Sequence, residues 1–413
     1  MGKYYTENTG FYKGIAPEKL VAEYGSPLYV YSEDILRQRC REMKSLSDYE
    51  KFAVNYSIKA NSNLHLLKIV RDEGLYADAM SPGEIHVLEL AGFSGEKILF
   101  IPNNVSLDEM AYAVERGITV SVDSMSQLAL FGKNFPNAKA AIRFNTGYGA
   151  GHHEKVITAG KKTKFGINDN SLENVKEIVS KYKIRVAGIN QHIGSLFMEG
   201  SAYLKSAELL CSLAYEFPEL EFIDLGGGFG ITYKKQEGEK PIELAPIRQR
   251  LNALINAFVD EYGSRIAFKI EPGRYIAAEC GVLLGTVHAL KYHAGINYVG
   301  TDLGFNVLQR PVMYDAYHEI EVYRGGEITD VGERKVTIVG NICESGDKLV
   351  KDRVLPEIEE GDMLGVMDAG AYGYSMASNY NNRLRPAEVL IASDGSHRLI
   401  RRRDTMEDLV RGF

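Results

Sequence analysis

The chain has 413 residues, of which 45% are hydrophobic and 25% are charged, and its formal net charge is −7. This balance is typical of a globular protein, and the length fits two or three domains or one large barrel with a smaller companion. An acidic chain argues against a nucleic-acid surface, and no apolar stretch approaches the ~20 residues that span a bilayer, so we expect neither nucleic-acid nor membrane binding.

The N-terminus, the histidines and the cysteines predict a cytoplasmic protein without a metal site. Residues 1–12 contain no apolar segment of the kind found in signal peptides. His152 and His153 are adjacent, but no third ligand lies at a spacing useful for a metal. The cysteines are far apart and form no C-x-x-C pair, which argues against a disulfide framework and a zinc site (Cys40, Cys211, Cys280 and Cys343).

Short β-rich runs alternate with amphipathic helical patterns in the first two thirds of the chain. The predicted strands are 52–58, 75–79, 98–101, 119–123, 140–145, 186–192, 221–225 and 267–271. The helical patterns between them include 82–91, 107–115, 124–131, 172–181, 202–217 and 251–262. This alternation indicates an α/β fold, and a (β/α)8 barrel in particular, because a doubly wound open sheet would use fewer strands over this length.

After residue 274 the helical patterns give way to short strand-like runs separated by Gly, Asp and Asn turns, which indicates a mostly antiparallel β-sandwich domain. The predicted strands are 282–292, 297–302, 319–323, 335–339, 362–368, 387–393 and 397–401. The run 28–31 is also suited to pair with this domain. We expect a barrel domain of residues 28–275 and a β-sandwich domain of residues 1–27 and 276–413.

Lys59 stands at the end of the first barrel strand, in Val54-Asn-Tyr-Ser-Ile-Lys-Ala-Asn61. Functional groups of parallel α/β folds collect at the carboxyl ends of strands, where a partly desolvated lysine can form a Schiff base with a carbonyl compound. An ordinary surface lysine after a strand fits this octapeptide equally well.

Later barrel strands end in strings that suit an anionic, flat ligand. In Asp224-Leu-Gly-Gly-Gly-Phe-Gly-Ile231, three glycines let backbone N–H groups approach a phosphate, although a tight turn is the alternative. This spacing matches neither G-x-G-x-x-G nor a P-loop. His192-Ile-Gly-Ser195 could supply a stacking ring and a phosphate donor, or simply a satisfied histidine.

Glu271-Pro-Gly-Arg274 closes the last barrel strand. Glu271 could hold a proton on a ring nitrogen, and Arg274 could bind a carboxylate or phosphate through two parallel bonds. The alternative for this string is a Pro-Gly turn flanked by a salt bridge.

Three strings in the β domain carry candidate functional groups. The thiol in Cys343-Glu-Ser-Gly-Asp347 lies beside acidic residues, which favours a proton donor over a nucleophile, with a buried structural cysteine as the alternative. Tyr372 lies between glycines, so its hydroxyl could reach a phosphate. Arg310, with Tyr314 nearby, could bind a carboxylate.

Taken in order, these strings resemble the fold-type III pyridoxal-phosphate decarboxylases. The resemblance runs from Tyr24-Gly-Ser-Pro-Leu-Tyr-Val30 to Arg385-Pro-Ala-Glu-Val-Leu390, and the combination of Lys-Ala-Asn, Cys-Glu-Ser-Gly-Asp and Ala-Tyr-Gly is its most specific part. It implies a (β/α)8 barrel with a β-sandwich domain and pyridoxal 5′-phosphate as cofactor. It also resolves Lys59 in favour of the Schiff base.

The resemblance implies a role for each matching position. Around the cofactor ring it places Lys59 at the aldehyde, His192 on the ring face, Glu271 at the pyridine nitrogen, and Asp78 and Glu84 in support of the lysine. It implies cofactor or phosphate contacts for Ser195, Gly226, Gly227, Gly228, Arg274 and Tyr372. It implies substrate contacts for Arg274, Arg310, Tyr314, Glu344 and Tyr372, with Cys343 as proton donor and with Cys343 and Glu344 supplied by the other subunit.

The implied reaction is decarboxylation of meso-2,6-diaminopimelate to L-lysine by a homodimer with shared active sites. Another diamino acid or polyamine precursor, such as carboxynorspermidine or a D-amino acid, stays open as substrate, as does a non-enzymatic pyridoxal-phosphate-binding protein. A racemase is disfavoured because it would need a tyrosine where Cys343 stands. Two stretches depart from the commoner family spelling, 146–164 with its Gly-His-His-Glu-Lys and Asn382-Arg-Leu-Arg385. These departures affect substrate detail more than cofactor use.

Overall fold

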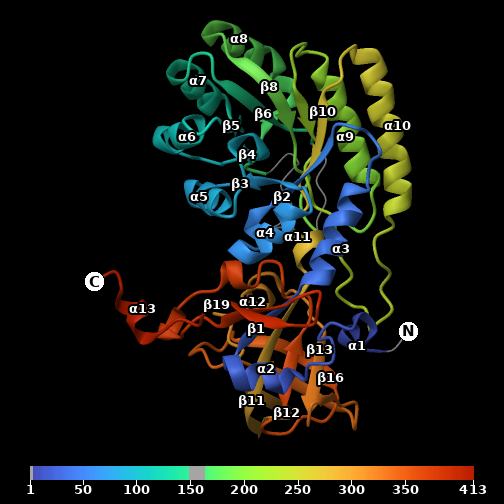
Figure 1. Cartoon of the computed structure of the whole chain (residues 1–413), viewed down its shortest axis with the longest axis vertical. Coiled ribbons are helices and arrows are strands. Elements are labelled where there is room, and N and C mark those ends of the chain that lie inside the picture. The colour runs from blue at the N-terminus through green and yellow to red at the C-terminus, as the bar shows by residue number, and fades with distance from the viewer. Residues whose placement is uncertain (1–2, 148–162) are drawn as a thin grey trace. The chain divides into compact units, whose positions relative to one another are not determined.

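The computed structural model describes residues 3–147 and 163–413 (Figure 1). The chain forms two compact units. Unit 1 comprises residues 1–37, 232–240 and 277–413, and unit 2 comprises residues 38–231 and 241–276. Most of the insert at 147–164, including His152 and His153, lies outside the described residues, so the expectations for this insert stay predictions.

Unit 2 is a closed parallel barrel, as the alternating pattern predicted. The order around the barrel is β5-β4-β3-β2-β10-β9-β8-β6, in which each strand pairs with the next. The pairing of β6 with β5 closes the ring. Every one of these described pairings is parallel. The strands are β2 (Phe52–Ser57), β3 (Tyr76–Ala79), β4 (Ile98–Phe100), β5 (Thr119–Val122), β6 (Lys139–Asn145), β8 (Arg185–Asn190), β9 (Phe222–Asp224) and β10 (Ala267–Ile270), with β7 (Ile167–Asn168) added beside β6.

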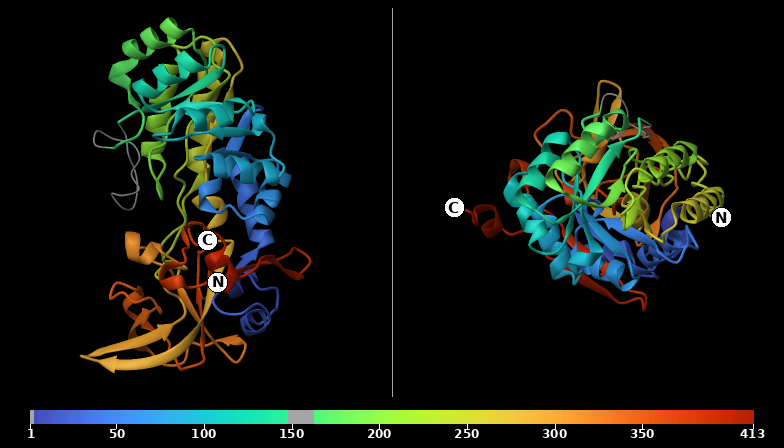
Figure 2. Two further views of the ribbon diagram at one scale, coloured as in Figure 1. Left: turned by 90° about the vertical axis from the view of Figure 1, so that its left-hand side faces the viewer. Right: turned by 90° about the horizontal axis from the view of Figure 1, so that it is seen from above.

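Helices follow the barrel strands and lie outside the ring that the strands form (Figure 2, right). Several begin at a serine whose hydroxyl accepts a hydrogen bond from the first helical turn, namely Ser81, Ser106 and Ser124. The helices are α4 (Leu64–Asp72), α5 (Pro82–Leu90), α6 (Leu107–Val114), α7 (Met125–Asn134), α8 (Leu172–Tyr182), α9 (Ser201–Ala214) and α10 (Leu244–Tyr262). Because each connection crosses back outside the barrel, all strands present their carboxyl ends at the same end of unit 2.

Unit 1 is built on a mostly antiparallel sheet, which confirms the expected β domain. Its longest strand, β11, pairs through its first half with β17 and through its second half with β12, so the sheet branches along this strand. The strands are β1 (Leu28–Ser32), β11 (Gly281–His293), β12 (Ile296–Thr301), β13 (Ile320–Arg324), β14 (Glu327–Ile328), β15 (Arg334–Val339), β16 (Lys348–Leu355), β17 (Met363–Val366), β18 (Ala387–Ile391) and β19 (His397–Arg401).

The remaining α-helices of the described residues are divided between the two units. α1 (Tyr5–Thr9), α2 (Pro17–Tyr24), α12 (Arg310–Tyr314) and α13 (Met406–Val410) belong to unit 1, whereas α3 (Glu33–Lys44) and α11 (Arg274–Ala277) cross from one unit to the other. Across residues 3–147 and 163–413, no helix is both long enough and apolar enough to cross a membrane.

Two features of unit 1 differ from the expected elements. Strand β1 pairs antiparallel with β11 and parallel with β18 and is buried throughout, which confirms the expected pairing of 28–31 with the β domain. The boundary differs, because β1 lies in unit 1 whereas the expected barrel domain began at residue 28. Strand β16 was not predicted. Its middle is charged, and Asp352 has a φ of 47°, which interrupts the alternation that identifies a strand.

The segment 232–240 leaves the barrel between β9 and α10 and joins unit 1. Lys235 attaches it, because its Nζ lies 2.7 Å from Asp368 Oδ2 and 3.3 Å from Glu279 Oε1. Buried Asp368 and Glu279 raise the pKa of Lys235 above its ordinary value against the effect of burial. The sequence did not predict that this segment joins unit 1, because a lysine in a polar loop is usually exposed to solvent.

Candidate active site

Lys59 lies in the single turn η1 (Ile58–Ala60) that directly follows β2, at the carboxyl end of the barrel. Its positive charge acts on three carboxyl groups, because it lowers the pKa values of Asp78, Glu84 and Glu271 relative to what burial alone would give. These groups come from β3, α5 and the end of β10. Barrel closure therefore gathers an amine and three acids that are far apart in the sequence.

Asp78 and Glu84 are each held by a short hydrogen bond. Ser57 Oγ donates to Asp78 Oδ2 at 2.6 Å, and the Met80 N–H donates to Glu84 Oε2 at the same distance. Burial raises the pKa of both carboxyl groups, and for Asp78 the neighbouring charge of Glu271 raises it further. The structure thus brings both predicted supporting acids close to Lys59.

Glu271 directly follows β10, and its carboxylate is buried at the carboxyl end of the barrel. The side chain is only 4% exposed, yet Oε1 has no hydrogen-bond partner among the described residues. Burial raises the pKa of Glu271, while Lys59 and Arg143 counteract this shift. A buried acceptor without a donor is costly, so this oxygen fits a donor that the chain itself does not supply. The protonated nitrogen of a pyridine ring is such a donor.

His192 is a neutral ring in this site. The Gly227 N–H donates to His192 Nδ1 at 3.2 Å, so this nitrogen carries no proton. Burial, together with the charges of Lys59 and Arg143, lowers the pKa of His192 well below its ordinary value. A neutral, mostly buried imidazole suits packing against a flat cofactor better than proton transfer.

The glycine run has a steric role in addition to the expected one. A Cβ on Gly227 would lie 1.9 Å from Glu271 O, and one on Gly226 would lie 2.2 Å from Gln191 O. Gly228 has a φ of 110°, a backbone conformation that only glycine adopts readily. The run therefore lets the loops after β8, β9 and β10 pack closely together.

Ser195 and Arg274 meet beside this glycine run. Arg274 donates to Ser195 Oγ through Nη2 at 3.0 Å and through Nε at 3.2 Å. Ser195 follows Gly194, whose carbonyl oxygen would lie 2.6 Å from a Cβ on Gly228. A buried guanidinium, a hydroxyl and a glycine-rich backbone in one place form a suitable cradle for a phosphate.

Arg143 is a functional candidate that the sequence reasoning missed. It lies on β6, is buried, and its guanidinium carbon lies 4.8 Å from the centre of the Phe165 ring. Burial lowers the pKa of Arg143 below its ordinary value, and the charges of Glu271, Asp123 and Asp78 counteract this shift. The available signal was a single charge inside the apolar run Ala-Ala-Ile-Arg-Phe.

Cys343 and Glu344 lie in unit 1, in the loop between β15 and β16. Cys343 is exposed, so the alternative of a buried structural cysteine is wrong. The Cys343 N–H donates to Asn381 Oδ1 at 2.8 Å, and Tyr380 Oη donates to Glu344 Oε1 at 2.7 Å. Cys343 and Glu344 are therefore hydrogen-bonded to the two residues that directly precede Asn382-Arg-Leu-Arg385.

Arg310 begins α12 and is 1% exposed. Its Nη1 lies 2.8 Å from His318 Nε2, and its guanidinium lies 4.8 Å from the centre of the Tyr233 ring. Tyr314 ends the same helix and is half-buried. Tyr372 is half-buried and has a φ of 57°. Substrate contacts for these three residues stay predictions.

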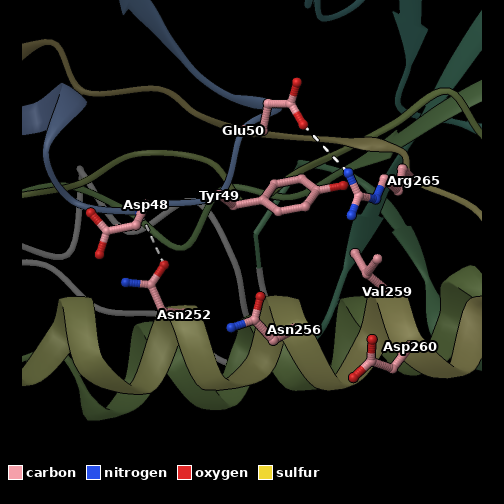
Figure 3. A pocket seen from close by; sticks show the side chains of 8 residues that line it. All are labelled: Asp48, Tyr49, Glu50, Asn252, Asn256, Val259, Asp260 and Arg265. Carbon is pink, nitrogen blue, oxygen red and sulfur yellow. Dashed lines mark hydrogen bonds and ion pairs between the residues drawn. The ribbon is translucent and has the colours of Figure 1, made fainter.

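Two cavities differ in whether predicted site residues line them. In unit 1, a cavity of about 480 Å³ is lined by Glu344 and Ser345 together with Lys348 and His293. In unit 2, Figure 3 shows a cavity of about 380 Å³ in which Glu50 faces Arg265. The second cavity adjoins the segments that precede β2 and β10, at the end of the barrel opposite to Lys59. No predicted site residue lines it.

Comparison with known proteins gives consistent results. Residues 33–278 match the family model described as pyridoxal-dependent decarboxylase, pyridoxal binding domain. The chain is 40% identical over 403 residues to a diaminopimelate decarboxylase of Methanothermobacter thermautotrophicus, covering 95% of this chain and 93% of the relative. It is 33% identical over 409 residues to the Escherichia coli K12 enzyme of that name, covering 95% and 94%.

Solved structures agree in fold. The crystal structure of diaminopimelate decarboxylase from Helicobacter pylori complexed with L-lysine is 31% identical and matches with a TM-score of 0.85, covering 95% of this chain and 98% of that one. A virus arginine decarboxylase, 21% identical with a TM-score of 0.79, shares the fold.

Proposed function

The chain belongs to the pyridoxal-dependent decarboxylases, and we propose that it removes one carboxyl group from meso-2,6-diaminopimelate to yield L-lysine, a step of lysine biosynthesis. Support comes from relatives named diaminopimelate decarboxylase that align over nearly the whole chain. The Helicobacter pylori structure with L-lysine, which is the product of this reaction, adds to it.

The observation that carries the proposal is Glu271 Oε1, a buried acceptor at the carboxyl end of the barrel that lacks a donor among the described residues. Pyridoxal phosphate fits there through its ring nitrogen. When bound, it supplies an aldehyde that reacts with amines and a ring that takes up the electron pair left by departing carbon dioxide. In this proposal, its other contacts are with Lys59, His192, Ser195, Gly226, Gly227, Gly228, Arg274 and Tyr372.

The charges around Lys59 influence the protonation states of the groups that would contact the cofactor. Lys59 and Arg143 favour the ionised form of Glu271, and this carboxylate would accept a hydrogen bond from the protonated ring nitrogen. Lys59 favours the ionised forms of Asp78 and Glu84 against the effect of burial, and these carboxyl groups would in turn stabilise its ammonium form. His192 stays neutral, so it packs on the ring without adding a charge.

The substrate contacts in this proposal are those that the family resemblance implies. We assign Arg274, Arg310, Tyr314 and Tyr372 to substrate contacts, and Glu344 to the distal amine. Cys343 of the partner subunit would return a proton to the α-carbon, since its thiol is exposed and is held through its backbone by Asn381. A site completed by a second copy implies a homodimer.

The deciding experiment incubates the purified chain and pyridoxal phosphate with meso-diaminopimelate and measures lysine and carbon dioxide together. Equal amounts of both are expected. Ornithine, carboxynorspermidine and a D-amino acid serve as competing substrates. Faster turnover of any of these three compounds would replace the proposed substrate. If neither they nor meso-diaminopimelate release carbon dioxide, the chain is a non-enzymatic binding protein.

A further inference from the structure

His318 and Arg310 are in contact in the interior of unit 1, where their side chains are 2% and 1% exposed. Arg310 Nη1 lies 2.8 Å from His318 Nε2, and His318 Nδ1 lies 2.7 Å from the carbonyl oxygen of Met367. Both distances are those of hydrogen bonds, so each ring nitrogen of His318 has a defined partner.

These two partners fix the protonation state of His318. A guanidinium only donates hydrogen bonds, so Nε2 accepts from Arg310 and carries no proton. A carbonyl oxygen only accepts, so Nδ1 carries the proton and donates it to Met367 O. His318 is therefore a neutral imidazole that presents an acceptor to the guanidinium.

The surroundings hold this imidazole in one orientation. Met367 directly follows β17, and Arg353 Nη1 donates to the carbonyl oxygen of His318. Tyr233 packs edge to face against the His318 ring, with the ring centroids 5.5 Å apart. The same Tyr233 ring has its centroid 4.8 Å from the guanidinium carbon of Arg310. The acceptor that His318 offers to Arg310 is thus fixed from several sides.

A neutral histidine orients the guanidinium without cancelling its positive charge, which a carboxylate in the same place would do. We propose that His318 is a positioning residue, which holds the guanidinium of Arg310 in the orientation that binds the carboxylate retained by the substrate. The inference rests on the proposed function, because it takes Arg310 as a substrate contact. It deepens that function by adding a residue that acts on the substrate only through Arg310.

The retained carboxylate is a better ligand for Arg310 than the carboxylate that leaves. Loss of carbon dioxide removes the negative charge of the leaving group, so an ion pair there would stabilise the substrate more than the transition state. An ion pair with the retained carboxylate is equally strong in both. Its strength therefore changes the binding of the substrate and leaves the rate of the chemical step unchanged.

The test compares L-lysine with cadaverine, which lacks only the carboxylate of lysine, as ligands of the full chain with bound pyridoxal phosphate. The readout is the dissociation constant of cadaverine divided by that of lysine, measured from the cofactor absorbance, so it needs no turnover. Charge-assisted hydrogen bonds to the carboxylate predict a ratio of roughly ten to one hundred in the unmodified chain. Arg310→Met should bring the ratio close to one.

Two substitutions distinguish a positioning role of His318 from a purely structural one. His318→Phe keeps a ring against Tyr233 but removes the acceptor, so the ratio should fall about tenfold. The KM for meso-diaminopimelate should rise by a similar factor, whereas kcat should stay within about twofold. His318→Gln keeps an acceptor for Arg310 and should hold the ratio within about threefold of the unmodified value.

The matched control is His397→Phe, which replaces another hydrogen-bonded histidine of unit 1. Tyr24 Oη lies 3.0 Å from His397 Nδ1, and the two rings pack edge to face with their centroids 5.7 Å apart. This substitution should lower thermal stability and leave the ratio, KM and kcat unchanged.

A second measurement applies even if His318→Phe does not fold. Magnetic resonance of histidine labelled with the heavy nitrogen isotope reports which ring nitrogen of each of the nine histidines carries a proton. The signal that is missing in His318→Gln belongs to His318. It should show a protonated Nδ1 and an unprotonated Nε2 at neutral pH, and a protonated Nε2 would overturn the inference.

The outcomes separate this inference from the proposed function. A ratio that is unchanged in His318→Phe, or that His318→Gln lowers equally far, shows that His318 does not position Arg310. A ratio near one in the unmodified chain overturns the inference as well, even if the chain decarboxylates diaminopimelate. Failure to decarboxylate that substrate, with the ratios as expected, removes the proposed substrate and leaves the role of His318 intact.

Discussion

His192 Nδ1 lies 3.5 Å from Glu271 Oε2, yet the two side chains do not form an ion pair. The Gly227 N–H donates to the same nitrogen, and burial keeps the pKa of His192 well below its ordinary value. The imidazole is therefore neutral, and the negative charge of Glu271 is balanced by Lys59 and Arg143. Because His192 is neutral, Glu271 is available to a ligand and is not neutralised by an ion pair with this ring.

Replacing Lys59 by alanine should abolish decarboxylation and the absorbance of pyridoxal phosphate bound through its aldehyde, because no other amine follows β2 at this position. Lys68→Ala is the control, since Lys68 is an exposed lysine of α4. Activity and absorbance are measured on both proteins. An unchanged absorbance band in Lys59→Ala, without added amine, would falsify the assignment.

The activity should depend on pH through Glu271. Burial raises the pKa of Glu271, and its ionised form is the competent one, so activity is lost as the pH falls through this raised pKa. Arg143→Met removes a charge that favours the ionised form, and the acidic limb of the kcat/KM profile should therefore move to higher pH.

Arg250→Met, which changes an exposed arginine of α10, is the control for that substitution and should leave the limb in place. A limb that moves to lower pH in Arg143→Met would contradict the electrostatic role of Arg143.

Gly227→Ala should destabilise the chain by at least about 2 kcal/mol, because its Cβ would lie 1.9 Å from the Glu271 carbonyl oxygen. Chemical denaturation measures the change in unfolding free energy. Gly83→Ala places its Cβ in ordinary contact, 3.7 Å from Ser81 Oγ, and should have little effect. Equal stabilities for the two variants would show that the loops after β9 and β10 do not pack as described.

Shared active sites predict complementation between inactive variants. Lys59→Ala and Cys343→Ala chains, mixed and allowed to exchange subunits, should regain up to about a quarter of the native activity, since half of the dimers then contain one intact site. Each variant incubated alone is the control. If exchange is demonstrated by mass and no activity returns, Cys343 does not act on the partner's site.

Local sequence was sufficient for the barrel strands and for the residues at their ends. Lys59, Asp78, His192 and Glu271 are all close to predicted strand ends, and the structure brings them together at one end of unit 2. Local sequence was insufficient for β16, because the positive φ of Asp352 breaks the alternation on which strand recognition depends.

By itself the sequence determined the order of strands and helices and the chemical groups that follow each strand, because hydrophobic periodicity and turn residues act over a few neighbouring positions. Only the tertiary structure decided which charged groups lie close enough to act on one another. Asp224 and Glu271 end neighbouring strands, whereas Arg143 reaches the same carboxylate from β6. Contacts of this kind depend on how the barrel closes and on what it buries, and neither property is contained in any short stretch of the chain.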